Sequence, residues 1–179
     1  AKIPHSSSAL KIRLEQARSI VDPVKKVQGY RDILAISNDD EISAGIYSEM
    51  IPALALKSPD SAAAFARSVV QSGGKQFLLA KQRAYFFLWD QAKRQGDAAM
   101  ASVGKEIFGT TDAYLNRTLG KYYLDSVNDQ AQAMKFLQRA SQVCTKENAL
   151  NTLISGSNIP DDKLELTANS FNAVIANDL

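Results

Sequence analysis

The stretch that decides the fold is residues 112–143, which read DAYLNRTLGKYYLDSVNDQAQAMKFLQRASQV. Each half of it opens with side chains that can accept hydrogen bonds from the free N–H groups of a first helical turn. Thr111 or Asp112 stands before the first half, and Asn128 or Asp129 stands before the second. The stretch therefore predicts two helices, and the short connection between them makes them antiparallel neighbours.

Similar capping signals divide the chain before this stretch. Asp22 followed by Pro23, and Ser58 followed by Pro59, each place a cap ahead of a proline at the first helical position. The polar run Asn38, Asp39, Asp40 and Glu41 puts acceptors and negative charge where a helix N-terminus has free N–H groups. These signals predict helices over residues 8–21, 23–37 and 41–54, and a fourth helix from residue 59.

Prolines and glycines mark other helix ends. Pro52 falls inside the apolar pattern of the third predicted helix, and we expect it to kink or end that helix because proline lacks a backbone N–H. Gly73 and Gly74 are expected to stop the fourth, since glycine reaches the left-handed conformation without steric cost. The remaining predicted helices cover residues 76–95, 98–108, 112–125, 128–143 and 146–155, with a last one from residue 160.

The whole pattern predicts an all-α chain of about nine or ten helices. Apolar residues recur at helical spacing, as at Leu10, Leu14, Ala17 and Val21, and no stretch shows the two-residue alternation of strands. Short connections favour stacked antiparallel helical hairpins, and the length of 179 residues suits a single domain over residues 1–179 with residues 1–7 as a flexible start.

The hairpins predicted over residues 76–108 and 112–143 are similar to each other. A shift of 34 residues carries Tyr85 onto Leu119 and Trp89 onto Tyr123, and a shift of 32 carries Ala101 onto Ala133. Self-similarity of this length is typical of helical repeat proteins. Residues 76–143 are therefore the most repeat-like part of the chain.

The second hairpin resembles a tetratricopeptide or Sel1-like repeat. The residues that carry the resemblance are Leu119, Gly120, Tyr123, Asp129, Ala133, Phe136 and Ala140. In such repeats small residues let two helices approach closely and large ones fill the neighbouring space, which are the roles that Gly120 with Ala133, and Tyr123 with Phe136, would take. The resemblance implies a tetratricopeptide-like α-solenoid that binds a protein or peptide. The alternative is that any antiparallel hairpin places small and large residues at such spacings.

Charge and hydropathy exclude several classes of function. Lys and Arg total 21 against 19 for Asp and Glu, and the absence of a basic run argues against nucleic acid. No apolar run approaches the roughly 18 residues of a membrane-spanning helix. The start at Ala1 instead of Met tilts the expectation toward an exported or periplasmic protein. Compartment and oligomeric state stay open.

Catalytic and metal-binding signatures are missing. The one histidine, His5, lies in a Pro- and Ser-rich terminus, and the one cysteine, Cys144, is interpreted as a small buried apolar residue. The acidic pairs at residues 39–40 and 161–162 sit at predicted helix starts, where capping explains them better than metal ligation. We therefore expect no metal site, no cofactor and no enzymatic activity.

The favoured function is a non-catalytic protein–protein interaction or scaffold domain. The candidate binding residues are Arg83, Arg117, Lys121 and Tyr122, which lie on the predicted first helices of the two repeat-like hairpins. One alternative is an accessory or structural protein of the bacterial envelope, which an upstream signal peptide or lipobox cysteine would favour.

A second alternative is a hydrolase that uses carboxylates such as Glu106 or Glu147. A deep pocket containing a carboxylate of raised pKa would favour that enzyme. The helix predicted over residues 76–95 also allows two interpretations. Its aromatic residues could form a binding surface, with Arg83, Tyr85, Trp89 and Arg94, or, as we prefer, part of the core.

Overall fold

The computed structural model describes residues 7–37, 39–72, 77–145, 169 and 172–178, and all regular structure in these ranges is helical. The all-α prediction is thereby confirmed. The chain forms two compact units, Ala1–Leu88 and Trp89–Leu179, each of which is described by itself. In the described ranges no helix is both long enough and apolar enough to cross a membrane.

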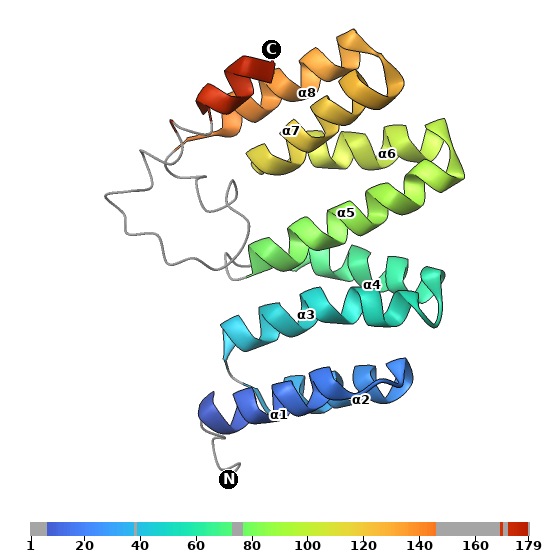
Figure 1. Cartoon of the computed structure of the whole chain (residues 1–179), viewed down its shortest axis with the longest axis vertical. Helices are drawn as coiled ribbons and strands as arrows, with labels where there is room; N and C mark the ends of the chain where they lie inside the picture. Colours follow the sequence, from blue (N-terminus) through green and yellow to red (C-terminus); the bar gives the residue numbers. More distant parts are fainter. Residues whose placement is uncertain (1–6, 38, 73–76, 146–168, 170–171, 179) are drawn as a thin grey trace. The chain divides into compact units, whose positions relative to one another are not determined.

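Unit 1 is built from helices that follow one another in space as they do in sequence (Figure 1). They are α1 (Ser7–Ser19), α2 (Pro23–Leu34), α3 (Asp40–Ala55), α4 (Pro59–Gln71) and the first part of α5 (Leu78–Gln95). Their core includes Leu10, Leu14, Val27, Tyr30, Ile33, Ile46, Met50 and Leu54, with Phe65 and Phe87 packed against it.

Three predicted caps of unit 1 are confirmed. Asp22 accepts hydrogen bonds from the backbone N–H groups of Val24 and Lys25 at 2.8 and 3.0 Å. Asp39 caps α3, and Ser58 accepts from the backbone N–H of Ser61 at 3.2 Å. These bonds satisfy donors that the first turn of a helix would leave unpaired.

Three details of the helices expected in unit 1 differ in the structure. The first helix ends at Ser19, so Val21 lies beyond it and is 94% exposed instead of contributing to the apolar face. Of the two effects expected of Pro52, it does not end the third helix, which continues to Ala55, and the backbone N–H of Leu56 still bonds to the Pro52 carbonyl at 3.3 Å. The second helix also ends earlier than expected, at Leu34.

Unit 2 contains the rest of α5 together with α6 (Asp97–Phe108), α7 (Ala113–Tyr122), the π-helical turn η2 (Tyr123–Val127), α8 (Gln130–Val143) and a short helical segment over residues 172–178. α7 contacts α6, η2 and α8. The buried residues are mainly Trp89, Val103, Ile107, Leu115, Leu119, Phe136, Leu137 and Ala140. Cys144 is also buried, as predicted.

The π-helical turn is a feature that the sequence pattern did not reveal. The helix predicted to run to Asp125 changes at Tyr123 into the wider turn, which ends at Asn128 in the left-handed conformation with φ of 57°. The backbone N–H of Asp129 then reaches back to the Tyr123 carbonyl at 2.9 Å. Asp112 and Asp129 cap α7 and α8, which selects one of the two residues left open at each helix start.

Several predicted features lie outside the described residues. They are His5, the glycine stop at Gly73 and Gly74, the helix over residues 146–155 with Glu147, and the acidic pair Asp161 and Asp162 with the start of the last helix.

Candidate binding surfaces

Two of the predicted binding residues share one carboxylate of their own chain. Arg117 Nε donates to Asp178 Oδ2 at 2.6 Å, and Lys121 Nζ lies 3.4 Å from Asp178 Oδ1. Lys121 also lies 3.6 Å from Asp125 Oδ2, one turn further on. Asp178 is only 13% exposed, so both cations of α7 already hold a partly buried anion.

The segment over residues 172–178 packs against both α7 and α8. Ile175 is fully buried in a cluster with Ala113, Ala140, Val143 and Cys144. Asn172 Nδ2 donates to the Cys144 carbonyl at 2.9 Å. The surface that carries Arg117 and Lys121 is therefore occupied by the C-terminal part of the same chain.

Tyr122 belongs to an aromatic cluster of unit 2. Its ring meets Trp89 edge to face with centroids 5.5 Å apart, and Lys93 Nζ lies 5.5 Å from the ring centroid. Tyr123 stacks on Phe136 with centroids 5.6 Å apart. Trp89 is only 4% exposed, which confirms our preferred interpretation of this residue as part of the core.

Arg83 lies on α5 in unit 1, where its side chain is exposed. Its positive charge favours the ionised form of Glu49. Of the four predicted residues, the structure thus brings Arg117 and Lys121 together on Asp178, while Tyr122 packs with aromatic side chains.

A polar cluster joins the first three helices of unit 1. Glu49 of α3 accepts hydrogen bonds from Arg18 Nε of α1 at 3.1 Å and from the Tyr30 hydroxyl of α2 at 2.7 Å. Partial burial opposes ionisation of Glu49, but these bonds and the charges of Arg18 and Arg83 outweigh it and lower its pKa. Burial and the bond to Glu49 raise the pKa of Tyr30.

The lowered pKa of Glu49, which is not one of the carboxylates named for the hydrolase alternative, makes this residue unsuitable as a general acid. A general acid at neutral pH needs a carboxyl whose pKa is raised so that it keeps its proton. Glu49 is held in the opposite state, as an ion-pair partner. Among the described residues, no group of three or more His, Cys, Asp or Glu side chains could hold a metal ion.

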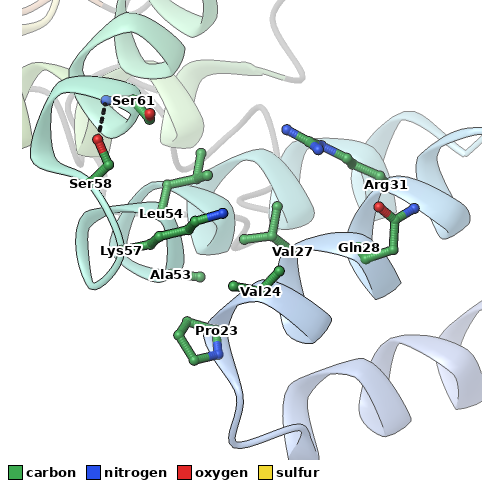
Figure 2. A pocket seen from close by; sticks show the side chains of 10 residues that line it. All are labelled: Pro23, Val24, Val27, Gln28, Arg31, Ala53, Leu54, Lys57, Ser58 and Ser61. Atoms are coloured by element: carbon green, nitrogen blue, oxygen red, sulfur yellow. Dashed lines mark hydrogen bonds between the residues drawn. The ribbon is translucent and has the colours of Figure 1, made fainter.

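One pocket of unit 1 lies between α2 and the junction of α3 with α4 (Figure 2). Its volume is about 200 Å³. The buried residues Val27, Ala53 and Leu54 form its floor. The residues around this floor are Pro23, Val24, Gln28, Arg31, Lys57, Ser58 and Ser61.

The rim of this pocket is exposed and rich in hydrogen-bond donors. In Figure 2, Lys57 and Arg31 extend from opposite sides into the space between them. Lysine offers three N–H donors, arginine five, and the serine hydroxyls one each. No Asp or Glu lines the pocket, so its polar groups complement an anion.

The sequence did not single out this pocket. Val24, in the first turn of the second helix, is half exposed because it lies at the pocket edge. The one signal available was the pair of proline-started helices, which place Pro23 and Ser58 at two helix N-termini. Nothing local indicates that these two termini meet at one pocket.

Comparison with known proteins identifies no relative: no protein-family model matches this chain, and no curated protein or solved structure matches it significantly.

Proposed function

We propose that this chain is a non-catalytic protein-interaction domain whose helices form stacked hairpins of the tetratricopeptide or Sel1-like kind. The observation that carries the proposal is the pocket of unit 1, which combines a buried apolar floor with an exposed rim of donors. Binding surfaces of proteins typically join a desolvated apolar anchor site to a polar rim.

The packing of α7 on α8 supports the repeat-like part of the proposal. A Cβ atom at Gly120 would lie 2.7 Å from Leu137 Cγ and 3.2 Å from the Ala133 carbonyl oxygen, so glycine permits the two helices to approach this closely. Tyr123 and Phe136, which resemble the large residues of such a repeat, stack on each other at the same junction.

Site-specific photo-crosslinking tests the proposal. A photoreactive amino acid replaces Val24 at the pocket edge, and in a control it replaces Ile12, another exposed apolar residue, which lies on α1 outside the pocket. In lysate of the source organism, position 24 is expected to cross-link a specific protein that position 12 does not capture. Equal labelling from both positions, or none from position 24, would count against a binding function for this pocket.

A further inference from the structure

We propose that the pocket of unit 1 binds an acidic segment of a partner protein that inserts one apolar side chain between α2 and α3. This inference rests on the proposed interaction function and specifies the partner's chemistry. It follows from three properties of the pocket, namely its size, its donors and the state of the neighbouring carboxylates.

The size of the pocket suits a single side chain. A protein cavity of about 150 Å³ accommodates benzene, whereas sites for small molecules and cofactors occupy roughly 300–1,000 Å³. At about 200 Å³, this pocket can hold one leucine-sized or phenyl-sized group on the floor of Val27, Ala53 and Leu54. An inserted peptide side chain therefore fits better than a cofactor.

The polar groups of the rim select for negative charge. Arg31 and Lys57 are both exposed, and bonds from such cations to carboxylates are about twice as strong as neutral ones. The Ser61 hydroxyl lies in the first turn of α4, whose N-terminus carries partial positive charge. In a partner segment, one carboxylate on each side of the inserted apolar residue could therefore bond to Arg31 on one side of the pocket and to Lys57 on the other.

Two carboxylates close in sequence to the rim accept hydrogen bonds, and a third, Asp60, lies beside Ser61 in the first turn of α4. Asp22 Oδ1 accepts two backbone N–H bonds at the start of α2, and Asp32 Oδ1 accepts from Gln28 Nε2 at 2.8 Å. Lys57 is close enough to Asp22 for its charge to favour the ionised form of that carboxylate. Among the described residues, however, no carboxylate lies within ion-pair distance of Lys57 or Arg31. These two cations are thus available to an incoming acidic segment.

The test is selection from a random phage-displayed peptide library on the full chain. The counter-selection uses the Arg31→Glu/Lys57→Glu variant, and Arg13→Glu on α1 serves as a charge-changing control outside the pocket. Circular dichroism checks that each variant remains folded. We expect selected peptides to share one apolar residue flanked by Asp or Glu.

The selected peptides are then measured by fluorescence anisotropy. Replacing their acidic residues by Gln, or introducing the double charge reversal, should weaken binding by about 10-fold or more, because two charge contacts are lost. Arg13→Glu should change affinity by less than about 2-fold. Higher salt should weaken the wild-type complex through screening.

Several results would overturn the inference. These are an empty selection, selected peptides without acidic residues, affinity indifferent to Arg31 and Lys57, and displacement by inorganic phosphate of peptides that lack an apolar residue. If any of them occurs while position 24 still cross-links a protein, the acidic-segment inference fails and the interaction function stands. If position 24 also fails to cross-link a protein, both the acidic-segment inference and the proposed interaction function are wrong.

Discussion

Replacing Gly120 by alanine tests the close approach of α7 and α8 directly. The new Cβ would lie 2.7 and 2.8 Å from Leu137 Cγ and Cδ2, and 3.2 Å from the Ala133 carbonyl oxygen. Leu137 is only 1% exposed, so its side chain cannot turn into solvent to relieve the overlap. The helices must separate or Leu137 must adopt a strained rotamer.

The magnitude follows from two opposing effects. Overpacking of a filled core costs about 1–3 kcal/mol, while alanine in a helix interior is favoured over glycine by about 1 kcal/mol. We therefore expect Gly120→Ala to lower the free energy of unfolding of unit 2 by up to about 2 kcal/mol. Gly104→Ala in α6 is the matched control, because its Cβ would meet Phe136 and Trp89 at ordinary distances of 3.5 and 3.7 Å. That control should be neutral or stabilising.

The assay is urea denaturation followed by the fluorescence of Trp89, the single tryptophan, which lies in unit 2. In a Leu137→Ala background the overlap with Leu137 is removed and only the contact with the Ala133 carbonyl remains, so the added Gly120→Ala should destabilise less. A double-mutant cycle measures this coupling. If Gly120→Ala stabilises unit 2 as much as Gly104→Ala does, the close approach that we describe is refuted.

Three further predictions concern other contacts. Glu49→Gln should destabilise unit 1 by about 1–2 kcal/mol near pH 7, because bonds to a charged group are lost. Since the pKa of Glu49 is lowered in the folded state, its contribution to stability is fully present above the ordinary carboxyl pKa of about 4.3. The stability difference between wild type and Glu49→Gln should therefore shrink as the pH falls below that value. A constant difference in thermal melts from about pH 7 to about pH 3 would contradict this. Asp178→Asn should lower the free energy of unfolding of unit 2, measured by Trp89 fluorescence, by about 1 kcal/mol, and should speed amide hydrogen exchange over residues 172–178. No change in either measurement would mean that the bonds to Arg117 and Lys121 contribute nothing. Asn128→Ala should cost about 1–2 kcal/mol because of its left-handed backbone, whereas Asn128→Gly should be nearly neutral, and equal losses would argue against that conformation.

Local signals accounted for most of the helices because helix formation depends on contacts a few residues apart. The caps at Asp22, Asp39 and Ser58 bond to N–H groups two or three residues ahead. The errors also have local causes. The π-helical turn after Tyr122 breaks the 3.6-residue period that was used to extend the helix to Asp125.

The candidate sites were less predictable than the helices. The sequence placed Arg117 and Lys121 on the same helix, but their shared partner Asp178 lies 61 and 57 residues away in sequence. The pocket joins residues 23–31 to residues 53–61, and its donors have no common motif. Helical periodicity tells which side chains share a face, but not which other face will cover them.

By itself, the sequence determined that this protein is helical, where most helices begin, and that several apolar faces are buried, because those properties follow from hydrogen bonds and spacing within single helices. Only the tertiary structure decided that Asp178 contacts both cations of α7 and that Arg31 and Lys57 lie at one pocket without a carboxylate among its lining residues. These are encounters between segments distant in sequence. They depend on how whole helices pack, as at Gly120 against Leu137, and no local pattern specifies them.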